Sequence, residues 1–262
     1  MDTTSIIPLD FVDLGLAYGL ILLTAGLARW QRFGGEGKFL WASVRMVVQL
    51  LAIGYLLEGV FALRHPLPVL AILVAMGLFA LQVIGSRIEK KMPRFYRVMA
   101  ISLLVGCGLV AFFFCSAVVG FSPWYHPRYL IPLAGMIIGN SMNGAALAAE
   151  RFAAEVTERQ DEIETALSLG ASSRQAAREA LRSAFRAALI PATNTMAAMG
   201  IVALPGMMTG QILSGTEPMI AVRYQIAIMC AITGSVALTS LLILMQGFRC
   251  YFTRDHRLIL PR

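Results

Sequence analysis

The chain alternates between long apolar stretches and shorter polar connections. A helix needs about 20 predominantly apolar residues to cross the hydrocarbon core of a bilayer. Seven stretches meet this requirement, at residues 9–28, 40–63, 67–85, 98–121, 130–149, 189–213 and 219–248. The pattern therefore predicts an all-α, polytopic membrane protein with about seven transmembrane helices in a single domain over residues 1–262.

Composition supports this prediction. Hydrophobic residues make up 58% of the chain and charged residues only 14%, whereas a soluble domain carries nearer 25% charge. The formal net charge of +7 is better explained by basic loops on the cytoplasmic side of a membrane than by a nucleic-acid surface. We therefore expect a multi-pass protein of the bacterial inner (plasma) membrane and no nucleic-acid partner.

The basic residues gather in every second connection. Of the 22 Lys and Arg residues, 18 fall in the connections 29–39, 86–97 and 150–188 or in the tail after 248. The alternate connections hold only Arg64 and Arg128. Positively charged connections stay in the cytoplasm, so the N-terminus is expected outside and the C-terminus in the cytoplasm.

The long hydrophilic segment, 150–188, has an acidic first half and a basic second half. Gly170 can end one helix, and Ser172 with Gln175 three residues later forms a capping box for the next. Arginines then recur at every fourth position, in one row along a helix: Arg174, Arg178, Arg182 and Arg186. The segment predicts a short acidic helix, an elbow, and a long basic helix that continues into the sixth span.

This elbow resembles the coupling loop with which ABC-transporter permeases dock on their ATPase. The stretch ETALSLGAS (164–172) is similar to the E-A-A-x-x-x-G signature of bacterial import permeases. Pro191 follows Gly170 by 21 residues, farther than is usual in importers, so the chain resembles a relative of that class. The resemblance implies a set of ATPase-coupling residues: Glu162, Glu164, Ala166, Leu167, Gly170, Ala171 and Ser172.

A longer resemblance, over about residues 40 to 230, is to the FetB-like iron-export permeases, which are relatives of plant aluminium-tolerance permeases. Five ordered blocks carry it: VRMVVQLLAIGY (44–55), PLAGMIIGNSM (132–142), LSLGAS (167–172), AALIP (187–191), and LPGMMTG (204–210) with Pro218 and YQI (224–226). It implies a homodimeric ABC transporter permease, in which a second copy of the chain and a separate ATP-binding subunit together move iron or another metal ion out of the cytosol.

Several polar and sulfur side chains inside the spans are candidates for the translocation path. Asn140 and Met142 lie near the middle of the fifth span, where packing between helices is the alternative role. In the sixth span, Pro191 and Pro205-Gly206 predict breaks that free backbone groups to line a cavity. Met136 and Gln211 are further candidates, as are Met207 and Met208, for which packing or gating is the alternative role. In the second span the candidates are Arg45 and Gln49, and Arg45 can instead extend to the interface.

Sites for catalysis or cofactors are not expected. His65, His126 and His256 fall in three separate connections, so no catalytic triad or zinc site can be assigned, and the ligands of any transported metal stay unknown. The G-x-x-x-x-G-K-[ST] motif for ATP is absent from the sequence. We expect a transport subunit rather than an enzyme. A seven-helix receptor or channel acting alone is the alternative, but it has no need of a coupling-type elbow.

Overall fold

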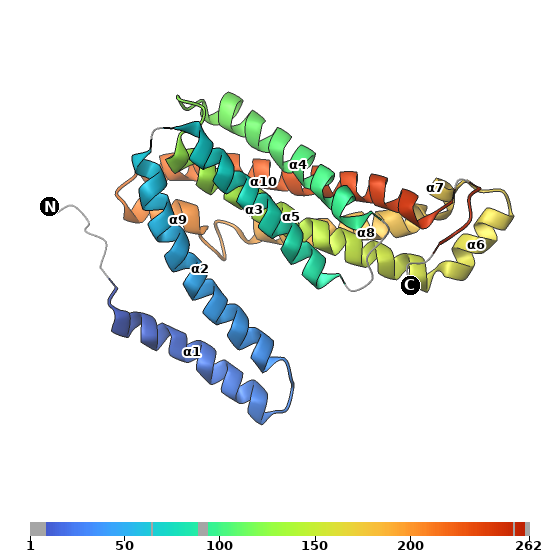
Figure 1. Ribbon diagram of the computed structural model, residues 1–262, viewed down its shortest axis with the longest axis horizontal. Coiled ribbons are helices and arrows are strands. Elements are labelled where there is room, and N and C mark those ends of the chain that lie inside the picture. The colour runs from blue at the N-terminus through green and yellow to red at the C-terminus, as the bar shows by residue number, and fades with distance from the viewer. Residues whose placement is uncertain (1–8, 64, 89–93, 254, 260–262) are drawn as a thin grey trace. The chain divides into compact units, whose positions relative to one another are not determined.

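A computed structural model describes residues 9–63, 65–88, 94–253 and 255–259, and most of them lie in helices (Figure 1). Within these ranges there is no strand, only two isolated backbone bridges. The all-α prediction is therefore confirmed. Four of the 18 basic residues that support the expected orientation lie outside the described residues, namely Lys90, Lys91, Arg254 and Arg262, as does Arg64 of the alternate connections.

The chain divides into two units. Unit 1 comprises residues 1–64 and 213–215, and unit 2 comprises residues 65–212 and 216–262. In unit 1, α1 (Phe11–Trp30) and α2 (Glu36–Ala62) pack together as a helical hairpin. The Tyr18 hydroxyl lies 2.9 Å from Ser43 Oγ across the hairpin. Most of its other apolar side chains are exposed, which suits helices that are surrounded by lipid or by other spans.

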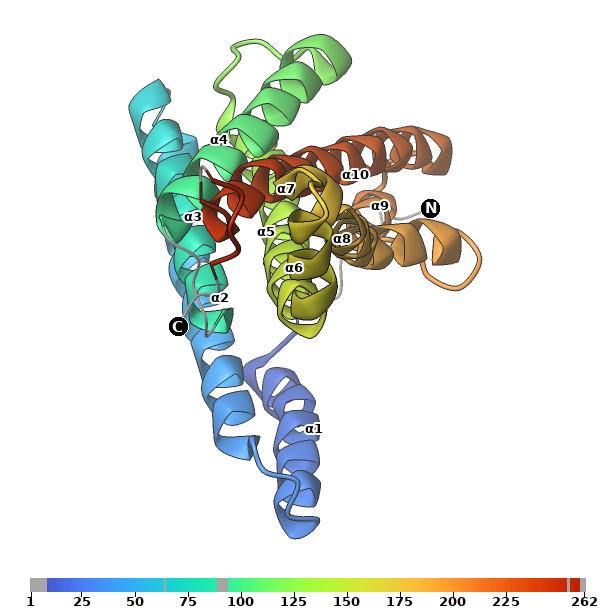
Figure 2. The same cartoon turned by 90° about the vertical axis from the view of Figure 1, so that its right-hand side faces the viewer.

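In unit 2, α5 (Pro127–Glu158) is the central helix (Figures 1 and 2). Four helices pack against it: α3 (Pro66–Arg87), α4 (Phe95–Phe113), α8 (Arg178–Ala198) and α10 (Pro218–Gly247). The remaining elements are shorter: the π-helix η1 (Phe114–Val119), α6 (Gln160–Ser168), α7 (Ser173–Ala176), α9 (Gly206–Leu213) and the 3-10 helix η2 (Phe248–Tyr251).

Small residues allow the helices of unit 2 to approach closely. A Cβ atom on Gly144 of α5 would lie only 2.6 Å from Val236 Cγ1 of α10. One turn away, the hydroxyls of Ser141 and Ser235 are 2.7 Å apart. Close contact between small residues and hydrogen bonding between helices are the main attractive forces inside a bilayer, where the hydrophobic effect does not hold helices together. This face of α5 is therefore a packing surface.

Six helices within the described ranges are long and apolar enough to cross a membrane: Phe11–Trp30, Glu36–Phe61, Pro66–Arg87, Phe95–Val119, Pro127–Glu158 and Pro218–Tyr251. They match six of the seven expected spans. The other expected span, 189–213, is divided among the second half of α8, an irregular segment at 199–205, and α9. The count of seven spans and the orientation of the termini therefore stay predictions.

Two helix boundaries differ from those expected from the sequence. The fifth span was expected to end at Ala149, but α5 stays helical to Glu158. Its 32 residues make it about 48 Å long, well beyond an apolar core of about 30 Å. Pro191 was expected to break the sixth span, but it lies inside α8. The break expected at Pro205-Gly206 is confirmed, because the irregular segment ends there.

Candidate functional site

The predicted elbow is present at one end of unit 2, with α6 and α7 on either side of it (Figure 1). Gly170 has φ +88°, a left-handed conformation that glycine adopts without steric cost. The Gly170 amide donates to Leu167 O and the Ala171 amide to Ala166 O, both at 3.0 Å. These two bonds form a Schellman motif, which satisfies the last carbonyls of α6. The prediction that Gly170 ends the acidic helix is confirmed.

The predicted capping box is also present. Ser172 Oγ accepts from the Gln175 amide at 3.4 Å, and Gln175 Oε1 accepts from the Ser172 amide at 2.9 Å. The basic half that follows was expected to be one helix. It consists of two, because α7 ends after one turn and α8 begins at Arg178, after Ala177. The second of these helices does continue toward the membrane segment, as expected.

The elbow presents both charge and apolar surface. The Glu162 side chain is 75% exposed, and Glu164 is exposed with its carboxylate bound by Gln160 Nε2 at 2.8 Å. Leu169, which was not among the expected coupling residues, lies directly before Gly170 and is 84% exposed. A Cβ atom on Gly170 would have no neighbour within 4 Å. The other proposed coupling residues, Ala166, Leu167, Ala171 and Ser172, are half-buried.

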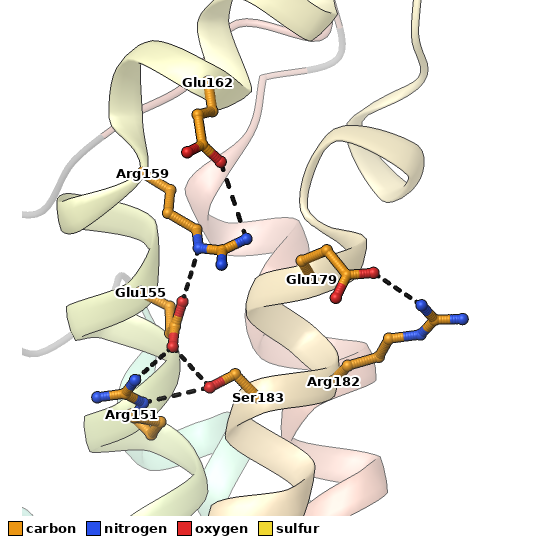
Figure 3. Close-up of polar contacts among 7 residues, drawn as sticks. All are labelled: Arg151, Glu155, Arg159, Glu162, Glu179, Arg182 and Ser183. Atoms are coloured by element: carbon orange, nitrogen blue, oxygen red, sulfur yellow. Dashed lines mark hydrogen bonds and ion pairs between the residues drawn. The ribbon is translucent and has the colours of Figure 1, made fainter.

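A buried carboxylate joins α5, which leads into the elbow, to α8, which leads out of it (Figure 3). Glu155, near the end of α5, is only 4% exposed. Its Oε1 atom accepts from Ser183 Oγ of α8 and from Arg151 Nη2, both at 2.6 Å, and its Oε2 atom lies 3.1 Å from Arg159 Nε. Because a buried charge is stable only when it is paired and hydrogen-bonded, this cluster fixes α8 against α5.

Arg159 extends the same network to α6. Its Nη1 atom lies 3.8 Å from Glu162 Oε2 while its Nε atom binds Glu155 (Figure 3). The acidic helix is thereby linked to the end of α5. The sequence did not reveal this cluster, because Glu155 and Ser183 are 28 positions apart and no local motif relates them.

The C-terminal tail also contacts the elbow. Nδ1 of His256 lies 2.7 Å from Ser173 Oγ and accepts from the Ser173 amide at 3.3 Å. A backbone bridge between Phe252 and Leu258 shapes this part of the tail. The tail and the elbow therefore lie on the same side of unit 2, which agrees with the shared cytoplasmic location that the basic residues predict for them.

The path candidates on α5 occupy different faces. Met136, Asn140 and Asn143 follow one another at spacings of four and three, and so share one face of the helix. Asn140 is exposed and donates to Met136 O at 2.8 Å, and Asn143 accepts from Arg87 Nη1 of α3 at 3.2 Å. Met142 is half-buried and, two positions after Asn140, points in another direction.

The remaining candidates in unit 2 follow the break in the sixth span. Met207, Met208 and Gln211 are half-buried on α9. Two other methionines, which no sequence motif indicated, accept hydrogen bonds from α10. Met196 Sδ lies 3.3 Å from Thr233 Oγ1, and Met199 Sδ lies 3.8 Å from Gln225 Nε2.

In unit 1, Arg45 and Gln49 lie one turn apart on an exposed face of α2. Within the described ranges of both units, no group of three or more His, Cys, Asp or Glu side chains is arranged to hold a metal ion.

Long apolar helices, packed through small residues and joined by charged connections, define a multi-pass helical membrane protein. The sequence model of one family, described as "Uncharacterised protein family (UPF0014)", matches residues 11–252. The chain belongs to this family. The match extends beyond the range of about 40 to 230 over which the resemblance was expected, at both ends.

The chain's relatives include one that is named as a transport protein. The chain is 38% identical to "UPF0014 membrane protein slr1647" of Synechocystis, over 97% of this chain and 98% of the relative. It is 29% identical to "Probable iron export permease protein FetB" of Escherichia coli, over 95% of each chain, and 28% identical to "Protein ALUMINUM SENSITIVE 3" of Arabidopsis thaliana, over 91% and 86%. No solved structure matches the chain. The expected kinship with FetB and the plant proteins is confirmed.

Proposed function

We propose that this chain is the membrane permease subunit of an ABC-type transporter that exports iron or another metal ion. In this proposal the chain forms one permease domain in the bacterial inner membrane, with its N-terminus outside and its C-terminus in the cytoplasm. It acts as a homodimer, and a separate subunit binds and hydrolyses ATP. The relative named as an iron export permease supports the transported substrate.

The elbow between α6 and α7 carries the ATPase part of the proposal. A docking site must present a fixed shape to its partner, and Gly170 and Ser172 fix the backbone here through the Schellman motif and the capping box. Leu169 offers an apolar anchor, and Glu162 and Glu164 offer charges for basic groups on the ATP-binding subunit. The Glu155 cluster then links the docked surface to α5 and α8.

The irregular segment 199–205 supports the homodimer and the path. Backbone that is not helical is tolerated at membrane depth only where protein covers it or where it lines a water-filled cavity. Ile201 is 90% exposed and Val202 81% exposed in the single chain. A second copy would cover this segment, and the interface would then border the path. The face of α5 that holds Met136 and Asn140 is the other proposed wall of the path, and Met142 lies on a neighbouring face. Met207, Met208 and Gln211 lie near the break in the sixth span. Arg45 and Gln49 are proposed for the cytoplasmic mouth.

Co-purification with the ATP-binding subunit, followed by metal-stimulated ATP hydrolysis in lipid, tests this function. Gly170→Val should abolish both, because a β-branched residue is strained at φ +88°. Gly170→Asn is the matched control for conformation, since asparagine tolerates left-handed angles. If asparagine restores binding, the elbow's conformation matters; if it does not, the partner needs the space that glycine leaves open. Normal binding and hydrolysis in the valine variant would contradict the coupling role.

A further inference from the structure

A groove of about 490 Å³ runs along the outside of unit 2, between α10 and the basic helices α7 and α8. Arginines line it on the side of the basic helices: Arg174, Arg178 and Arg182. Apolar side chains form its other wall, among them Phe185 of α8 and Leu241 and Met245 of α10. The groove therefore places cationic groups next to a continuous apolar surface.

The arginines of the groove differ in their pairing. Arg182 Nη1 binds Glu179 Oε1 at 2.7 Å. Arg174 and Arg178 are both exposed, and within the described ranges neither has a recorded ion pair. Arg174 of α7 and Arg178 of α8 both line the groove, and guanidinium groups can bind the oxygens of a phosphate group, whose geometry matches their planar donors. The groove thus has charge to bind an anion at its polar end.

The position of the apolar wall relates the groove to the bilayer. Leu241 and Met245 belong to the last two turns of α10, an apolar helix long enough to span a membrane. Leu241 is 46% exposed. The wall is therefore the end of a lipid-facing surface, and the arginines lie where that surface meets the polar connections and the tail. Basic groups at this level attract anionic lipids.

We propose that this groove binds one anionic phospholipid of the adjacent leaflet. The lipid phosphate binds Arg174 and Arg178, and an acyl chain lies along Phe185, Leu241 and Met245. An acidic segment of a protein partner would match the arginines but would leave the apolar wall without a complementary surface. A lipid satisfies both halves of the groove with one molecule.

The test measures lipids retained by the purified full-length chain in native mass spectrometry. The chain is taken from nanodiscs that contain equal amounts of phosphatidylcholine and phosphatidylglycerol. The wild type should retain phosphatidylglycerol preferentially. Arg178→Gln should lower this retention about fivefold, since each basic residue near an anionic surface contributes roughly that factor. Arg186→Gln, the same change two turns along α8 and outside the groove, is the matched control and should have little effect.

Two further measurements distinguish a bound lipid from a free anion or a protein partner. Leu241→Gln should also lower retention, because it removes apolar contact without changing a basic residue, and soluble glycerol phosphate should not displace the lipid. The proposal is overturned by equal retention of both lipids, by equal loss in Arg186→Gln, or by displacement with glycerol phosphate. It is also overturned if Arg178→Gln keeps the lipid but loses the ATP-binding subunit, which would assign the arginines to that protein. Should Arg178→Gln fail to fold, wild-type selectivity and Leu241→Gln decide.

Discussion

Ser183 of α8 donates a 2.6 Å hydrogen bond to the buried carboxylate of Glu155 on α5. Arg151 binds the same oxygen, and Arg159 binds the other (Figure 3). Glu155→Ala removes the anion that these groups share. We expect it to lower the free energy of unfolding by about 1.5–3 kcal/mol, the value of a hydrogen bond to a charged group, because the arginines left behind are 46% and 41% exposed and stay solvated. Thermal unfolding of the purified protein in lipid measures this loss.

Two milder variants calibrate that measurement. Ser183→Ala should cost about 1 kcal/mol, because it removes one hydrogen bond and leaves both arginines in place. Glu179→Gln breaks an exposed pair with Arg182 (Figure 3) and should cost less than about 1 kcal/mol. Equal stability of Glu155→Ala and Glu179→Gln would show that the buried cluster does not hold α8 against α5.

Gly144 and Gly139 provide a second matched comparison, within one helix. A Cβ at Gly144 would lie 2.6 Å from Val236 Cγ1, whereas a Cβ at Gly139 would have no neighbour within 4 Å. Gly144→Ala should therefore destabilise the protein by about 1–3 kcal/mol through overpacking, and Gly139→Ala should not. The relative yield of folded protein by size-exclusion chromatography, together with the melting temperature, distinguishes the two. A harmless Gly144→Ala would mean that α5 and α10 can move apart at no cost.

The tail contact predicts a local effect at the elbow. Both His256→Ala and Ser173→Ala remove the hydrogen bond between the imidazole and the serine hydroxyl. Each variant should accelerate hydrogen exchange of the first amides of α7, because the tail no longer covers the helix start. Arg257→Ala is the control, since in the described part of the tail its hydrogen bonds with Thr253 involve only its backbone amide and carbonyl. Unchanged exchange in Ser173→Ala would show that the tail contributes nothing to the elbow.

The faces of α5 predict different transport phenotypes under the proposed function. Asn140→Leu replaces an exposed amide with an apolar surface and should abolish metal efflux from loaded vesicles while leaving assembly with the ATP-binding subunit intact. Met142→Leu conserves volume and hydrophobicity on another face and should transport at close to the wild-type rate. Normal efflux by Asn140→Leu would remove that face from the path and leave the amide a packing role.

Sidedness can be tested with single cysteines in a background from which the native cysteines Cys107, Cys115, Cys230 and Cys250 have been removed. An impermeant thiol reagent applied from outside should not label Leu169→Cys at the elbow or Phe33→Cys between α1 and α2. Trp124→Cys, between η1 and α5, should react. All three native side chains are more than half exposed, so burial does not explain protection. The reverse labelling would contradict the orientation drawn from the basic residues and, with it, the coupling role.

Local chemistry explains what the sequence predicted correctly. The end of α6 at Gly170 and the cap at Ser172 depend on residues within five positions of each other, so the chain's local preferences decide them. The apolar stretches likewise predict the long helices, because length and hydropathy suffice to recognise them.

Tertiary context explains what the sequence did not give. The end of α5 was placed at Ala149 because the apolar pattern ends there, yet Glu155 finds partners in Arg151, Arg159 and the distant Ser183, and the helix continues. Pro191 was expected to break a helix, but it lies inside α8, where neighbouring groups can satisfy the carbonyl that its missing N–H leaves unpaired. Such compensation allows proline inside helices of membrane proteins.

The unbroken course of α5 has a mechanical consequence for the proposed transporter. Fifteen residues separate Asn140 from Glu155 within one helix, a distance of about 22 Å. Such a segment acts as a lever arm, because sharp bends in helices need a proline, a bulge or a similar interruption, and Pro132, the proline inside α5, precedes Asn140. A tilt of about 10° over that length displaces one end by about 4 Å relative to the other. A movement imposed at the elbow would thus reach the middle of the membrane directly, with no hinge between.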